Sequence, residues 1–422
     1  MTIKQPLVRE GDKQTFEIER LLSWGEGGSG RVRVSGAFPE EKVTARIDHI
    51  GKHATFATAV AVERGRLGRR SPPCDKHVSR GGRCTGCPLM ALNEGDQRTV
   101  IRGMLKSEHG LEVDGVEEAP VSLGYRWSAK RIAFGSHGRL RLGSFVRGSH
   151  NPADMEGCLV DHPRIQAAAD EIAEAARDLR IAAYDERTKK GSLRAVWLRT
   201  DGERVLSTIV TADDDPVPIQ RLSGRLTQSD GVAWSVHPGD DNLLRGVVAK
   251  PIRGVEAIEV SGVNIGPLGF LQPNPVVAER MYAWLGEGLK GKQAFDLYAG
   301  SGAMTRRLRP LFAEVLACES HEESAAALGV EAESAEVFLA RQTETPNAVV
   351  ANPPRKGLGK DVVAELLRLR PQRIHLMECG PAGLAADIEA LGEAYEVESL
   401  RAFDTLPQTA HVELVAKLVL RG

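Results

Sequence analysis

Several residue and segment types are scarce in this 422-residue chain, and each scarcity excludes a class of protein. Its six cysteines are too few and too unevenly spaced for a disulfide framework. No stretch approaches the ~20 apolar residues of a membrane span, and the N-terminus has no apolar segment of signal-peptide length. Internal repeats and polar low-complexity tracts are also missing. We therefore expect two or three folded domains in the cytoplasm, with no membrane contact.

The formal net charge of −2 conceals an uneven distribution of charge. Residues 1–90 contain sixteen Lys or Arg against ten Asp or Glu. Residues 124–152 contain six cations and no carboxylate, with Tyr125, Trp127 and Phe134 between them. Such a segment suits phosphate contact and base stacking, but it is equally typical of ordinary solvated surface. The composition leaves both interpretations open.

The first part of the chain predicts a small β-barrel. Four runs alternate apolar and polar residues, at 15–22, 31–35, 42–49 and 55–62, and glycine or proline separates them. The glycine cluster at 25–30 predicts a hairpin turn rather than a phosphate loop, because no Lys-Ser/Thr pair and no helical pattern follow it. From 72 to 265 the pattern is mixed, with a helix at 164–179 and strands near 193–198 and 204–210.

The last third of the chain alternates predicted strands and helices, which is typical of a parallel sheet with crossover helices. The fold class is therefore α/β. Two final extended runs, at 396–402 and 411–420, predict an antiparallel hairpin at the sheet edge. The predicted strands lie at 293–297, 314–318 and 347–351, and the predicted helices at 276–289, 303–311 and 362–369.

Cys379 has the most informative setting of any single residue. It follows the apolar run 373–378 and is followed at once by Gly380 and Pro381. A strand that stops at a turn places the next side chain at the carboxyl edge of the sheet, where open α/β sheets bind ligands. A thiol there can act as a nucleophile, although a lone free cysteine is more often a small buried hydrophobe.

Three other strand ends carry groups suited to an adenosine-type cofactor. Gly300 and Gly302 lie between a strand and a helix, where glycine lets the backbone pass close to a ligand. Glu319 ends the next strand, at the position that accepts hydrogen bonds from ribose hydroxyls in nucleotide-binding folds. Asn352 ends a third strand, and two prolines behind it fix a rigid turn.

Five motifs in chain order resemble the S-adenosylmethionine-dependent RNA (uracil-5-)-methyltransferase family, and the resemblance spans almost the whole chain. It implies a TRAM-like, OB-like RNA-binding barrel over 1–70, a central α+β iron–sulfur domain over 71–264 and a Rossmann-like class I methyltransferase domain over 265–422. The motifs are Phe270-Leu-Gln272-Pro-Asn274, Asp296-Leu-Tyr-Ala-Gly-Ser-Gly302, Asn352-Pro-Pro-Arg-Lys-Gly357, Glu378-Cys-Gly-Pro381 and Pro407-Gln-Thr-Ala-His-Val-Glu413.

The resemblance also implies a role for each site residue. Cys379 would add to carbon-6 of uracil, and Glu413 would remove the carbon-5 proton after methyl transfer. Period two along 411–415 would place His411 and Glu413 on one face of a strand. Ser334 is the nearest candidate for an adenine-binding residue. The cofactor S-adenosylmethionine would be bound by Gln272, Tyr298, Gly300, Gly302, Glu319 and Asn352.

A second group of cysteines has metal-ligand spacing. Cys84 and Cys87 are separated by two residues and follow Cys74 by ten, a spacing that zinc and iron–sulfur centres both accept. With the distant Cys158, these cysteines resemble the four ligands of the family's 4Fe-4S cluster. We therefore expect that cluster, with zinc as the alternative. Cys318 is left over and is expected to pack in the sheet.

Two departures from the family pattern keep other functions open. Asn352 stands where the family usually has Asp, and Gly380 where it usually has Asn. Asn-Pro-Pro also begins the turn of exocyclic-amine methyltransferases, which need no cysteine but want an aromatic residue at the position of Arg355. A catalytically inactive RNA-binding iron–sulfur protein is the other alternative. The resemblance favours a monomer that methylates ribosomal RNA over one that methylates transfer RNA.

Overall fold

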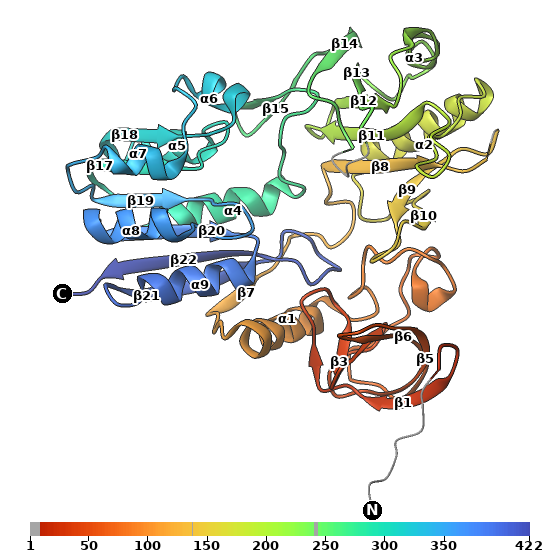
Figure 1. Cartoon of the computed structure of the whole chain (residues 1–422), viewed down its shortest axis with the longest axis horizontal. Helices are drawn as coiled ribbons and strands as arrows, with labels where there is room; N and C mark the ends of the chain where they lie inside the picture. Colours follow the sequence, from red (N-terminus) through yellow and green to blue (C-terminus); the bar gives the residue numbers. More distant parts are fainter. Residues whose placement is uncertain (1–8, 137, 240–243) are drawn as a thin grey trace, which may run out of the picture.

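The computed structural model describes residues 9–136, 138–239 and 244–422, which form three large sheets and one two-stranded hairpin (Figure 1). The first sheet is a small barrel, as predicted. Its strand order is β1-β5-β6-β4-β3-β2, and only Ile18 and Glu19 separate edge strands β1 and β2, so one segment closes the sheet on itself. The strands are β1 (Lys13–Glu17), β2 (Arg20–Leu21), β3 (Gly27–Ser29), β4 (Val32–Ser35), β5 (Lys42–Ile50) and β6 (Thr55–Arg64).

The glycine cluster at 25–30 is not simply the predicted hairpin turn. Gly27–Ser29 forms β3, which pairs with both β2 and β4. A Cβ on Gly27 would lie 2.6 Å from Ile18 Cγ2, so glycine lets this strand approach the barrel core. The prediction was wrong here because close packing outweighs the low strand propensity of glycine.

A second sheet forms the centre of the chain, in the order β10-β9-β8-β11-β12-β13-β14. Helices α2 and α3 bury their apolar residues against this sheet. The helix predicted at 164–179 is α2, and the two strands predicted after it are β11 and β12. The elements are β8 (Ser128–Phe134), β9 (Arg141–Phe145), β10 (Pro152–Asp154), α2 (Pro163–Asp178), β11 (Leu193–Thr200), β12 (Val205–Thr211), α3 (Pro216–Ser223), β13 (Gly231–Val236) and β14 (Ala249–Gly254). The 3-10 helix η1 (Val78–Arg80) and helix α1 (Glu94–His109) precede this sheet.

The third sheet is the predicted α/β unit, in the order β18-β17-β19-β20-β22-β21-β7. Strands β17 to β20 are parallel, and helices cover both faces (Figure 1). After the hairpin β15 (Ile258–Val260) and β16 (Val263–Ile265), its elements are α4 (Pro275–Gly286), β17 (Gly291–Leu297), α5 (Ala303–Leu308), β18 (Phe312–Cys318), α6 (Glu322–Leu328), α7 (Ala335–Ala340), β19 (Ala348–Ala351), α8 (Lys360–Leu369), β20 (Arg373–Glu378), α9 (Pro381–Leu391), β21 (Tyr395–Phe403) and β22 (Glu413–Leu420).

Two details of the C-terminal hairpin differ from the prediction. β21 is not the sheet edge, because β7 (Gly115–Glu117) pairs with it in parallel. β22 begins at Glu413, so His411 lies in the preceding loop rather than on the strand. Both differences arise from contacts between segments far apart in sequence, which periodicity does not report.

One apolar core links the barrel to the third sheet. Leu21 and Phe38 of the barrel segment belong to the same buried cluster as Leu92, α1, α8 and α9. Helices α4 and α5 cover the opposite face of the sheet with a separate cluster. Within the ranges that the structure describes, no helix is long and apolar enough to cross a membrane.

Candidate active site

The carboxyl edge of the third sheet gathers the residues predicted to bind the cofactor. Leu297, the last residue of β17, is paired with Cys318 of β18 and with Ala351 of β19. The residues that follow these strands, Tyr298, Glu319 and Asn352, therefore meet at one edge. The strand order reverses at β17, and ligands of open α/β sheets bind in the crevice at such a reversal.

The glycine loop at this edge is held to Glu319. The backbone N–H of Gly300 donates to Glu319 Oε2 at 2.8 Å, and that of His321 donates to Oε1 at 2.7 Å. Tyr298, Gly300 and Gly302 have φ of 57°, 56° and 80°, the left-handed region that glycine tolerates best. A carboxylate has about four lone-pair sites, so Glu319 keeps acceptor capacity for a ribose hydroxyl.

Asp296 anchors this loop, although sequence reasoning did not single it out. Its side chain is 2% exposed and accepts a hydrogen bond from Thr305 Oγ1 in α5. Burial raises the pKa of Asp296 to about 7. The carboxyl thus joins the end of β17 to α5 across the glycine loop. The sequence signal for this anchor was an acid at the end of an apolar strand, shortly before the two glycines.

Gln272 and Ser334 each lie beside residues that border this crevice. Gln272 hydrogen-bonds to Tyr282 of α4, and both line a cleft of about 70 Å³ together with Ser301. Ser334 begins α7, and Glu333 beside it donates its N–H to the carbonyl of Glu319 at 2.9 Å. The structure therefore brings both residues to the edge where the glycine loop lies.

Cys379 and Glu413 face one another across two antiparallel strands. The last pair of the β20–β22 ladder joins Glu378 to Leu414, so Cys379 and Glu413 are the next opposed positions. Cys379 is exposed. Partial burial and the Glu413 carboxylate raise the pKa of Cys379, whereas Arg355 lowers it. Burial raises the pKa of Glu413 to about 7, against the opposing effect of Arg355.

Arg355 completes this group, and sequence reasoning assigned it no role. It hydrogen-bonds to Cys379 and stabilises negative charge on both Cys379 and Glu413. A Cβ on Gly380 would lie 2.6 Å from the Arg355 carbonyl oxygen, so glycine lets the Asn352–Gly357 turn approach the cysteine. The sequence signal for Arg355 was a cation directly after the two prolines of this turn.

Cys74, Cys84, Cys87 and Cys158 converge in a second place, between the barrel and the central sheet. Burial raises the pKa of Cys87, and the other three cysteines raise it further, whereas Arg126 lowers it. Within the described part of the chain, no three His, Cys, Asp or Glu side chains form a group that could hold a metal ion. Cys318 is 1% exposed and packs in the sheet core, as expected.

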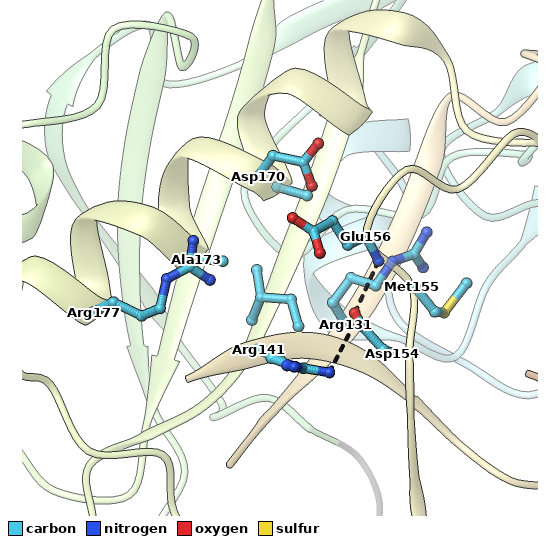
Figure 2. A pocket seen from close by; sticks show the side chains of 10 residues that line it. Arg131, Arg141, Asp154, Met155, Glu156, Asp170, Ala173 and Arg177 are labelled. Carbon is cyan, nitrogen blue, oxygen red and sulfur yellow. Dashed lines mark hydrogen bonds and ion pairs between the residues drawn. The ribbon is translucent and has the colours of Figure 1, made fainter. Parts of the chain in front are cut away.

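The basic segment 124–152 divides between the interior and the surface. Arg131 is 3% exposed and forms an ion pair with buried Asp161, whereas Arg139 and Arg141 are exposed. Figure 2 shows a pocket beside Arg131 in which Arg141 pairs with Asp154 at 3.2 Å. Its volume of about 20 Å³ is enough for roughly one water molecule, so it is no substrate site.

Known proteins similar to this chain cover nearly its full length. An uncharacterized RNA methyltransferase of Geobacter sulfurreducens is 31% identical over 98% of this chain and 91% of its own length. Another from Halalkalibacterium halodurans is 25% identical over 99% of this chain and 98% of its own. The family model described as tRNA (Uracil-5-)-methyltransferase matches residues 339–420, which include Asn352, Cys379 and Glu413.

A solved structure supports the fold. The Pyrococcus abyssi tRNA (uracil-54, C5)-methyltransferase, in complex with S-adenosyl-L-homocysteine, superposes with a TM-score of 0.76 at 24% identity. The match covers 96% of this chain and 99% of that one. It confirms the predicted α/β fold with a Rossmann-like methyltransferase domain. The chain belongs to the S-adenosylmethionine-dependent RNA (uracil-5-)-methyltransferase family.

Proposed function

We propose that this enzyme methylates carbon-5 of a uridine in RNA through a transient covalent bond to Cys379. The observation that carries this proposal is the convergence of Cys379, Arg355 and Glu413 at an exposed sheet edge. A nucleophile, a cation and a carboxylate are the three groups that this chemistry requires. The edge also adjoins the crevice beside the glycine loop.

In this mechanism the Cys379 thiolate adds to carbon-6 of the ring, which turns the pyrimidine into an enolate with a nucleophilic carbon-5. S-adenosylmethionine supplies the sulfonium methyl group that carbon-5 takes. Arg355 stabilises the thiolate before attack. Glu413 then removes the carbon-5 proton, and the electron pair of that C–H bond restores the double bond as the C–S bond breaks. The products are 5-methyluridine, S-adenosylhomocysteine and the Cys379 thiolate, with the carbon-5 proton on Glu413.

The properties of Glu413 suit a general base. A pKa of about 7 leaves a large fraction of the group ionised at neutral pH while it remains basic enough to accept a proton. Half-burial of its side chain keeps bulk water from competing for that role.

For the cofactor, we propose the groups that end β17, β18 and β19. Glu319 would accept from the ribose, and Gly300 and Gly302 would let the backbone approach the ligand. The remaining groups that would hold it are Gln272, Tyr298 and Asn352. The amide of Asn352 also has both a donor and an acceptor for the uracil edge, so Asn in place of Asp is compatible with binding.

We propose that Cys74, Cys84, Cys87 and Cys158 hold a 4Fe-4S cluster. Four convergent thiols are the ligand set of such a cluster. Burial raises the pKa of Cys84 and Cys158, and Arg126 and Arg131 oppose that effect. Zinc, which accepts the same cysteine spacing, is the alternative.

We propose large-subunit ribosomal RNA as the substrate, on the strength of the barrel and the cysteine cluster. We also propose that the protein acts as a monomer, because one chain supplies every group named above. The test is incubation of the protein with S-adenosylmethionine and unmodified transcripts of 23S rRNA or tRNA, followed by mass mapping of the nucleosides. We expect 5-methyluridine in the ribosomal transcript and none with Cys379→Ala.

Other outcomes of this experiment identify the alternatives. Methylation of tRNA alone would reverse the substrate assignment. Methylated exocyclic amines formed equally well by Cys379→Ala would replace the carbon-5 chemistry. No methylation of either RNA, by protein that still binds both, would mean an inactive RNA-binding protein.

A further inference from the structure

A pocket of about 220 Å³ lies where the barrel, the cysteine segment, the central sheet and the loop before β22 meet. Its volume is several times the ~30 Å³ of one water molecule. Four segments far apart in sequence supply its walls, which include Trp24, Thr85, Phe145, Arg147, Thr409 and His411. The pocket borders the cysteine group through Cys84, and its walls include no residue of the cofactor crevice or of the catalytic group.

Trp24 is the feature of the pocket that points to a ligand. Its side chain is 46% exposed, although burial of an aromatic ring of this size is strongly favourable. The Arg147 guanidinium lies 4.5 Å from the ring centroid, and the His411 ring meets Trp24 edge-on with centroids 5.1 Å apart. The indole is therefore held in place by two neighbours while almost half of its surface stays open.

The backbone around the pocket is also fixed. Arg147 donates its N–H to Thr85 Oγ1 at 3.1 Å and its guanidinium N–H to the Trp24 carbonyl at 2.6 Å. A Cβ on Gly25 would lie 2.6 Å from Pro88, so the Trp24 loop packs directly on the cysteine segment. A site whose aromatic wall is already ordered loses little conformational entropy on binding.

The charge of the pocket favours a base over a phosphate. Glu26 Oε1 lies 3.3 Å from Arg147, so this ion pair leaves the Trp24 wall without a net positive charge. Other cations lie on either side of the pocket. On the barrel, Arg33 lies near Arg147 and 5.9 Å over the exposed Phe56 ring. Toward the catalytic group, both Arg147 and Arg355 lie close enough to His411 to lower its pKa together with burial.

This alternation of aromatic rings and cations runs from Phe56 through Trp24 to His411, two residues before Glu413. Single-stranded RNA binds to such surfaces by stacking its bases on aromatic side chains while cations contact its phosphates. We infer that the Trp24 pocket binds an unpaired nucleobase of the substrate RNA, close in sequence to the uridine that enters the catalytic site. The inference rests on the proposed function and names a subsite for the same RNA.

Tryptophan fluorescence tests this inference without requiring methyl transfer. Among the five tryptophans, Trp24 alone is exposed, so stacking of a base on it should quench the protein's fluorescence. The probe is a short unstructured RNA with one uridine. We expect Trp24→Ala to lose most of the quenching and to bind roughly 5- to 100-fold more weakly, with Trp24→Phe in between. Trp284→Phe, which removes a tryptophan from α4, should bind as the wild type does.

An abasic scan of the same RNA keeps the test valid if Trp24→Ala folds poorly. Removing the base at one position near the uridine should weaken wild-type binding, and the same removal should weaken binding by Trp24→Phe less. Equal affinity of wild type and Trp24→Ala, or a scan with no sensitive position beside the uridine, would overturn the inference even if 5-methyluridine forms. Quenching and a sensitive position without any 5-methyluridine would instead contradict only the proposed function.

Discussion

At the scale of single residues, the proposed role of Glu413 predicts how the reaction responds to pH. Burial raises its pKa to about 7, and only the ionised carboxylate can accept the carbon-5 proton. We therefore expect the methylation rate to fall as the pH drops below about 7. Glu413→Gln should lower the rate by roughly 10²- to 10⁴-fold. A pH–rate profile with Glu396→Gln, an exposed carboxylate on β21, as the control checks this. A rate independent of pH between about 5.5 and 8.5, a range that extends more than a unit to either side of that pKa, would contradict the role of Glu413.

Arg355 should control the reactivity of the thiol. Its positive charge lowers the pKa of Cys379, so Arg355→Ala should move the pH dependence of Cys379 alkylation upward. Loss of a positioned electrostatic donor typically lowers kcat by roughly 10²- to 10³-fold. Arg355→Lys keeps the charge and should shift the alkylation profile less than Arg355→Ala does. An unchanged alkylation profile in Arg355→Ala would show that Arg355 does not act on the thiol.

At the scale of elements, the sequence predicts the helices and strands that form from local residue patterns. It does not predict contacts between segments far apart in the chain. Strand–helix alternation identifies the third sheet, and glycine at a strand end identifies the loop proposed to hold the cofactor. Periodicity does not reveal that β7 extends this sheet or that Gly27 lies in a strand, because both depend on contacts across the fold. Arg355 was missed for the same reason, since its role comes from its position beside β20 and β22.

The turn at Gly380 gives an element-scale prediction. Gly380→Ala places a methyl group 2.6 Å from the Arg355 carbonyl, so the Asn352–Gly357 turn must move. We expect a loss of about 1–3 kcal/mol in unfolding free energy and a roughly 100-fold lower kcat. The control is Gly103→Ala in α1, where a Cβ meets nothing within 4 Å. Full activity of Gly380→Ala would mean that the turn has no such constraint.

Two buried carboxyls beneath this turn give a second prediction. The two carboxyls are Glu378 at the end of β20 and Asp387 in α9, and Glu378 is only 1% exposed. Burial and the neighbouring Asp387 raise the pKa of Glu378. A raised carboxyl pKa means that the folded state binds more protons than the unfolded state. Stability should therefore fall as pH rises above 4.5, on the order of 1.4 kcal/mol per pH unit until the folded-state pKa is reached. Denaturant unfolding of Glu378→Gln should show a flatter dependence on pH, and a profile parallel to that of wild type would refute this account.

At the scale of the whole molecule, the barrel, the cysteine segment and the catalytic sheet act as one body because they share an apolar core. The cysteine group lies at their junction. Cys87→Ser should lower the iron content and absorbance of anaerobically purified protein, as well as its melting temperature. Cys318→Ala, a buried cysteine elsewhere, should leave the iron content unchanged. A colourless wild-type protein that contains zinc would refute the assignment of the cluster.

The most direct test of the central claim is the covalent bond between Cys379 and the substrate. Glu413→Gln should stall after methyl transfer, because no group removes the carbon-5 proton. Mass spectrometry of this variant, incubated with RNA and S-adenosylmethionine, should find an adduct of methylated uridine on Cys379. Cys379→Ala in the same background should form none. Normal turnover by Glu413→Gln, or an adduct on another residue, would contradict the account.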